Sequence, residues 1–103
     1  MSLFPLDGPA SQDTISVTTS TVQEAKIGAS ALSERKVVTL QPVDGKIYVY
    51  FGDGASTPSA ATVIADGFVQ FRNAKNSYEC SHRQPVFILA VSGTVNVKVA
   101  ERA

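Results

Sequence analysis

The most reactive side chains in the sequence are its one cysteine and one histidine, Cys80 and His82, two positions apart. Alternate residues of a β-strand share a face, so the pair could act as thiolate and base or as two metal ligands. However, the polar residues after Ser81 lead to Pro85 and favour a turn with a solvated histidine. No motif supplies the third and fourth ligands that zinc needs. We therefore predict no catalytic, cofactor or metal site.

Two other patterns could carry chemistry. The run Gly52-Asp53-Gly54 could cradle a phosphate or bind calcium, but it lacks both the Gly-Lys-Ser/Thr ending and the regular series of carboxylates. A tight bend after a strand explains the run more simply. Paired carboxylates for glycoside hydrolysis would have to come from predicted turns and polar strand faces. The candidates are Glu34, Asp44, Asp53, Asp66 and Glu79.

Tyrosines offer a third possibility, since Tyr48, Tyr50 and Tyr78 could stack on a sugar ring. Tyr48 and Tyr50 alternate with Ile47, Val49 and Phe51, so they are expected on the face opposite the core. An outward pair of tyrosines suits either a sugar site or a subunit interface, where tyrosine is enriched. We favour the interface, because exposed aromatic patches mark contacts between proteins.

The elements that must position these residues are strands. Alternating and β-branched segments predict strands over residues 14–23, 36–41, 46–51, 68–72, 77–80, 86–91 and 94–100. Asp44-Gly45 predicts a tight hairpin, and residues 52–65 predict a surface loop with a brief extended piece at 62–64. The predicted core is Val38, Leu40, Ile47, Val49, Phe51, Val69, Phe71, Val86, Ile88, Val95, Val97 and Val99. The chain is predicted to be an all-β, antiparallel, jelly-roll-like β-sandwich of seven to eight short strands, with a small barrel as the competing closure.

The N-terminal segment differs from the rest. Residues 1–13 contain two prolines and little periodicity, which predicts an extended arm before a sandwich domain of residues 14–103. The arm nevertheless carries Leu3, Phe4 and Leu6, whose apolar side chains would gain from docking on a neighbouring molecule. Together with Tyr48 and Tyr50, these three residues are the predicted interface.

The composition argues against nucleic acids and membranes as partners. The 103 residues include nine Lys+Arg and nine Asp+Glu, so no basic field attracts nucleic acid. The longest apolar run, residues 86–91, is far shorter than the roughly 20 residues needed to cross a bilayer. With no signal-peptide pattern, the sequence predicts a soluble protein that does not bind membranes. A single cysteine allows no intrachain disulfide, so packing and association with other copies must supply stability.

The order of features also supports a resemblance. The segment ALSERKVVTLQPVDGKIYVYFGDG is followed by ADGFVQF and by VFILAVSGTVNVKVAE, which reads as a closing hairpin over residues 88–99. Together these segments, covering about residues 31–101, resemble small virion structural proteins of tailed bacteriophages. The resemblance implies a non-enzymatic β-sandwich that decorates or stabilises a capsid or forms part of a head fibre, within a virion assembled in the host cytoplasm.

The same resemblance implies the partners, which are other copies of the chain and the major capsid protein or another virion protein. Binding at a threefold point of a shell favours a homotrimer. The alternative is a carbohydrate- or receptor-binding module of a virion, with residues 52–65 and the tyrosines forming a glycan site. An enzyme is the third possibility, for which the residues suggest no substrate.

Overall fold

The computed structural model describes residues 10–28, 30–52 and 56–103, and these form strands and one short helix. The strands are β1 (Ala10–Val17), β2 (Gln23–Glu24), β3 (Val37–Pro42), β4 (Ile47–Phe51), β5 (Phe68–Gln70), β6 (Asn76–Glu79), β7 (Val86–Ala90) and β8 (Val95–Arg102). The helix is α1 (Ala60–Asp66).

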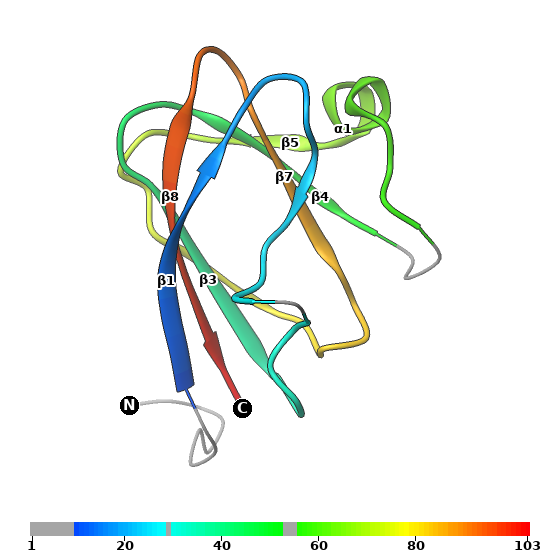
Figure 1. Ribbon diagram of the computed structural model, residues 1–103, viewed down its shortest axis with the longest axis vertical. Coiled ribbons are helices and arrows are strands. Elements are labelled where there is room, and N and C mark those ends of the chain that lie inside the picture. The colour runs from blue at the N-terminus through cyan, green and yellow to red at the C-terminus, as the bar shows by residue number, and fades with distance from the viewer. Residues whose placement is uncertain (1–9, 29, 53–55) are drawn as a thin grey trace.

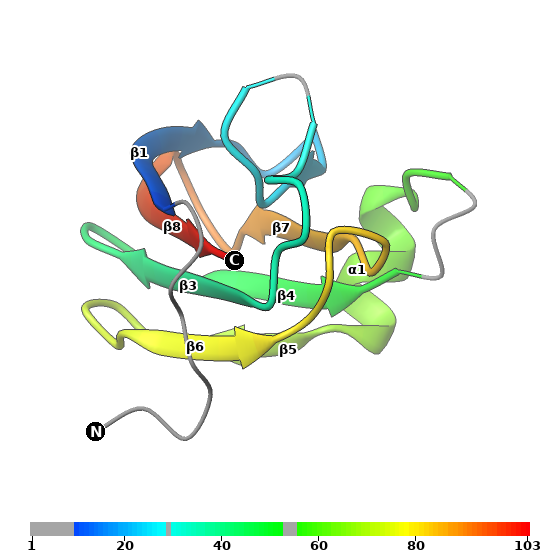
Figure 2. The same cartoon turned by 90° about the horizontal axis from the view of Figure 1, so that it is seen from below.

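The strands form two four-stranded antiparallel sheets that face each other. The first sheet has the order β1-β8-β3-β6 and the second sheet the order β2-β7-β4-β5. The chain changes sheet at every step except from β4 to β5, which is the connectivity of an eight-stranded jelly roll. Figures 1 and 2 show the two layers, with β5 and β6 along one open side and β1 along the other. The predicted β-sandwich is confirmed.

The core lies between the sheets and follows from strand alternation. Every second residue of β3 and β8 is buried, as are Ile47 and Val49 of β4, as expected for strands with one face on the core. Nine of the twelve predicted core residues are buried: Val38, Leu40, Ile47, Val49, Val86, Ile88, Val95, Val97 and Val99.

The other three core predictions, Phe51, Val69 and Phe71, are wrong. Their exposed fractions are 41%, 41% and 65%. Phe51 does continue the inward face of β4, but it is the last residue of that strand. Along β5 the predicted faces are reversed, because Gln70 is the inward residue there and is 2% exposed. Its amide is satisfied by hydrogen bonds, so a polar side chain can take the buried position.

The two predicted hairpins are also wrong, because β3 and β4 lie in different sheets, as do β7 and β8. At Asp44 the chain crosses between the sheets, and its carboxylate accepts hydrogen bonds from the backbone N–H and side-chain amide of Asn96, at 2.8 and 3.1 Å. Gly93 has a positive φ of 62° in the second crossing. Turn chemistry identified both bends correctly, but it does not specify which strand the chain pairs with next.

A helix replaces the extended piece predicted at residues 62–64. Ser59 caps α1 by accepting a hydrogen bond from the backbone N–H of Thr62 at 3.2 Å, and Gly67 ends it with a bond from its N–H to the carbonyl of Val63. The helix lies against β4 and β7 on the outer side of the second sheet (Figure 2), and Val63 is fully buried there. This cover contributes to the burial of β7, which is buried on both of its faces.

The predicted domain boundary also moves. β1 begins at Ala10 and pairs with β8 along its whole length, so residues 10–13 belong to the sandwich and not to an arm. The strand ends at Val17, well before the predicted end at residue 23. Residues 1–9, with Leu3, Phe4 and Leu6, lie outside the described residues.

Candidate interaction surface

Cys80 and His82 do not form a reactive pair. The thiol is buried, with its Sγ atom 3.9 Å from Nη2 of Arg35 and 3.7 Å from the carbonyl oxygen of Tyr78. Burial raises the pKa of the Cys80 thiol, and the nearby Arg35 charge offsets only part of that effect, so the thiol is protonated at neutral pH. His82 is half-buried, not solvated as predicted. Among the described residues, no three His, Cys, Asp or Glu side chains come together as metal ligands.

The acidic candidates do not lie in a shared buried pocket. Glu34, Asp44, Asp66 and Glu79 are all exposed. Asp44 is occupied by its bonds to Asn96 and serves the crossing between the sheets. Asp53 lies outside the described residues, as do Gly54 and Ala55. The described members of this set therefore provide no buried pair of carboxylates.

Tyr48 and Tyr50 lie on the outer face of the second sheet, as predicted, but they are half-buried there. Tyr48 is the cross-strand neighbour of Leu89, and Tyr50 that of Phe87. These two β7 side chains are 0% and 3% exposed, so the tyrosines lie beside a covered surface and do not form a free platform. Helix α1, whose first six residues fall in the loop predicted over residues 52–65, covers part of the same face.

The exposed large apolar side chains of the described residues gather instead around β5. We call this set the β5 surface: Phe51, Ile64, Phe68, Val69 and Phe71, with exposed fractions of 41%, 50%, 42%, 41% and 65%. Phe68 and Val69 belong to β5 itself, Phe71 follows it, and Ile64 lies on the helix that leads into it. Because β5 is the last strand of the second sheet, this apolar surface surrounds a strand edge.

An aromatic cluster supports the surface from the inside. The rings of Phe51 and Phe68 lie 5.6 Å apart, and the ring of Tyr78 lies 5.4 Å from Phe51 in a T-shaped contact and 6.0 Å from Phe68. These distances are typical of favourable aromatic pairs. The cluster joins β4 and β5 of one sheet to β6 of the other, and so closes the open side of the sandwich.

Hydrogen bonds fix the same side. The hydroxyl of Tyr78 donates to Oε1 of Gln70 at 2.8 Å, and Nε2 of Gln70 donates to the carbonyl oxygens of Leu40 at 2.8 Å and Ala74 at 2.7 Å. Buried amides that satisfy their donors and acceptor in this way hold one conformation. The β5 surface is therefore carried on a fixed edge.

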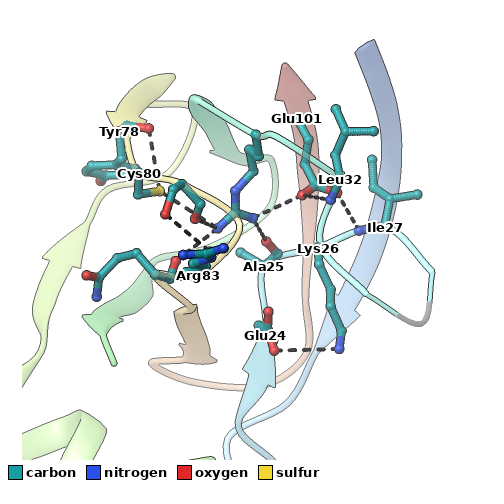
Figure 3. A network of polar contacts seen from close by, with 12 residues as sticks. Glu24, Ala25, Lys26, Ile27, Leu32, Tyr78, Cys80, Arg83 and Glu101 are labelled. Carbon is teal, nitrogen blue, oxygen red and sulfur yellow. Dashed lines mark hydrogen bonds and ion pairs between the residues drawn. The ribbon is translucent and has the colours of Figure 1, made fainter. Parts of the chain in front are cut away.

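A buried ion pair that sequence reasoning missed holds the end of the first sheet where β3 begins and β8 ends. Nη1 of Arg35 lies 3.0 Å from Oε2 of Glu101, and the two side chains are 0% and 1% exposed. The carboxylate also accepts the backbone N–H groups of Ile27 at 2.9 Å and Leu32 at 3.0 Å (Figure 3). Glu101 takes the next inward position of β8 after Val95, Val97 and Val99, so the alternation of that strand could have predicted its burial.

The guanidinium ties further segments to the pair. Its Nη2 donates to the carbonyl oxygens of Ser81 at 3.0 Å and Gln84 at 2.9 Å, and its Nη1 also donates to that of Ala25 at 3.3 Å. Arg35 therefore joins the segment after β2, the turn before β7 and the end of β8. Because both charges are buried and engaged with the chain, we assign this pair a structural role.

Comparisons with known proteins give no family for this chain. No family model matches the sequence, and no curated protein matches it either. In the part of the chain that the structure describes, no helix is long and apolar enough to cross a membrane.

Proposed function

We propose that the protein is a structural component of a phage virion, of the decoration, cement or head-fibre type, and that it acts by binding other proteins. The observation that carries the proposal is the β5 surface, an apolar surface on a fixed sandwich edge. Exposed apolar side chains that gather in one region of a protein mark contacts between proteins. The jelly-roll order of the strands supports the proposal, because viral capsid domains use the same architecture.

The partners in this proposal are other copies of the chain and the major capsid protein or another virion protein. A formal net charge of zero suits this role, because it avoids repulsion between copies that crowd on one shell. The place of action is then the virion, which is assembled in the host cytoplasm. Leu3, Phe4 and Leu6 stay in the proposal as contact residues of the arm.

The experiment is to find the chain in particles. Cells that carry the gene are induced to release particles, which are purified on a density gradient and digested for quantitative mass spectrometry. Peptides of this chain that co-sediment with the particles, at many copies relative to the most abundant shell protein, support the proposal. Recovery of the chain only in the soluble fraction, while the shell protein sediments, would contradict it.

A second candidate is a glycan- or receptor-binding module, favoured by a shallow polar groove on the outer face of the first sheet. Amide, hydroxyl and cationic side chains line the groove, among them Gln12, Thr14, Thr39, Gln41 and Lys98. Such groups can hydrogen-bond the hydroxyls of a sugar. A glycan array tests this candidate: binding that Gln41→Ala abolishes would place a sugar in the groove, and binding that Tyr48→Ala abolishes would place it on the second sheet.

A further inference from the structure

We infer that a second copy of this chain docks on the β5 surface, so that two β5 strands pair antiparallel about a twofold axis at Val69. The two second sheets then continue into one another across the pair. The inference deepens the proposed function, because it names the surface through which the copies associate.

The position of the apolar side chains favours an edge-on contact. Phe68 shares the inner face of the second sheet with Gln70, whereas Val69 lies beside Tyr48 on the outer face. Because apolar side chains lie on both faces of β5, a partner covers more of them by packing against the edge of the strand than by packing on one face of the sheet. As the end strand of its sheet, β5 offers backbone groups for such pairing. It also contains no charged residue or proline to prevent it.

The twofold symmetry of the pair follows because the described residues present one exposed apolar surface. All large apolar side chains that are exposed in the described residues belong to the β5 surface. Of the surfaces that the described residues form, two copies can therefore cover apolar surface with apolar surface only when each presents this same surface to the other. An interface in which both subunits use one patch has twofold symmetry.

The area is sufficient for a stable pair. With about 200 Å² for a large apolar side chain, exposed fractions of 41–65% leave ~450 Å² of apolar area per copy. Two copies that cover all of this surface would bury ~900 Å² of apolar area, and because interfaces are about 60% apolar, the total reaches at most ~1,500 Å². That total is the standard size of a specific protein interface.

The register also brings opposite charges together. A twofold axis at Val69 sets the start of each β5 beside the end of its partner. Asp66, the last residue of α1, precedes β5, and Arg72 follows β5; both are exposed. The axis therefore brings Asp66 toward the partner's Arg72 on both sides of the pair. The pairing is therefore complementary in charge.

The first test is the mass in solution, measured by light scattering after size exclusion at about 50 µM. The full chain should show twice 10.9 kDa, and Val69→Lys should show the monomer mass. The matched control, Thr14→Lys, adds the same charge to an exposed position of β1, the edge strand of the other sheet, and should leave the dimer intact. Equal circular dichroism spectra and melting temperatures establish that each variant is folded.

The second test is a charge exchange that needs no change in the apolar residues. Asp66→Arg or Arg72→Asp alone creates two like-charge contacts and should weaken the dimer about tenfold. The double variant, which restores opposite charges, should return the dissociation constant to within a few-fold of the original.

Several results would overturn the inference: a monomeric full chain, a trimer, a dimer that Val69→Lys leaves unchanged, a double variant no tighter than the single ones, or a dimer that requires residues 1–9. None of these results decides the virion role, which the particle experiment tests separately. A chain found at many copies in virions but monomeric in solution refutes the β5 pairing alone. A dimeric chain that is absent from virions refutes the virion role alone.

Discussion

Replacing Glu101 with alanine should be among the most damaging single changes in the protein. The change removes the acceptor for three donors, which are Nη1 of Arg35 and the backbone N–H groups of Ile27 and Leu32. It also leaves the Arg35 guanidinium buried without its counter-charge. Breaking a buried pair in this way costs about 3–5 kcal/mol. A domain of this size has about 5–15 kcal/mol of total stability, so a large part of it would be lost.

The assay is urea unfolding followed by circular dichroism, with the free energy of unfolding taken from the midpoint and slope. The matched control is Glu79→Ala, which removes an exposed carboxylate from β6 and should change stability by less than about 0.5 kcal/mol. The charge-preserving variant Arg35→Lys should also be destabilised, because a lysine cannot reproduce the fork of bonds to Ser81 and Gln84.

A double replacement separates the ion pair from the packing around it. The variant Arg35→Met with Glu101→Leu removes both charges together and should be more stable than Glu101→Ala, since no unpaired buried charge remains. A loss below about 1 kcal/mol for Glu101→Ala, or a loss equal to that of Glu79→Ala, would refute this reasoning.

Three further predictions concern the core and the closed side of the sandwich. Cys80 should react slowly with a thiol reagent at neutral pH and faster as pH rises or urea is added, because burial raises its pKa; equal rates in folded and unfolded protein would contradict this. Gly52→Ala should cost about 1–3 kcal/mol in urea unfolding, because the new Cβ would lie 2.5 Å from Cε2 of Phe87; unchanged stability would show that the ring moves freely. Tyr78→Phe should lower the free energy of unfolding by about 1–3 kcal/mol in the same assay, because Oε1 of the buried Gln70 loses the hydroxyl as its donor. Unchanged stability would show that this hydrogen bond does not stabilise the fold.

The raised pKa of Cys80 also predicts how the stability of the protein changes with pH. A thiol whose pKa is higher in the folded protein binds its proton more tightly there than in the unfolded chain. Its contribution to stability is therefore complete below the ordinary thiol pKa and is lost as pH rises through the raised value.

Strand alternation made much of the fold predictable. Val95, Val97 and Val99 face inward because alternate residues of a strand share a face, and the sandwich follows from several such segments in a row. Strand alternation predicted the wrong inward face for β5. This edge strand has three residues, too few for a periodic pattern, and its inward position is taken by Gln70, whose buried amide is satisfied by hydrogen bonds. Helix α1 was missed because seven residues are too few to show helical periodicity.

The candidate site was harder to predict than the fold. Tyr48 and Tyr50 were placed correctly on an outer face, but sequence alone does not show that a helix from the next loop covers part of that face. The β5 surface was missed because Phe51, Val69 and Phe71 are the residue types expected in a core. Partners far apart in the chain are invisible to local patterns, as the 66-residue separation of Arg35 and Glu101 shows.

The measurement that tests the central claim most directly is backbone hydrogen exchange at two protein concentrations. If the protein acts by burying the β5 surface against another copy, peptides spanning residues 67–72 should exchange more slowly in concentrated than in dilute solution. Peptides from β1, at the opposite edge, should exchange equally in both. Exchange at residues 67–72 that does not depend on concentration would contradict the account.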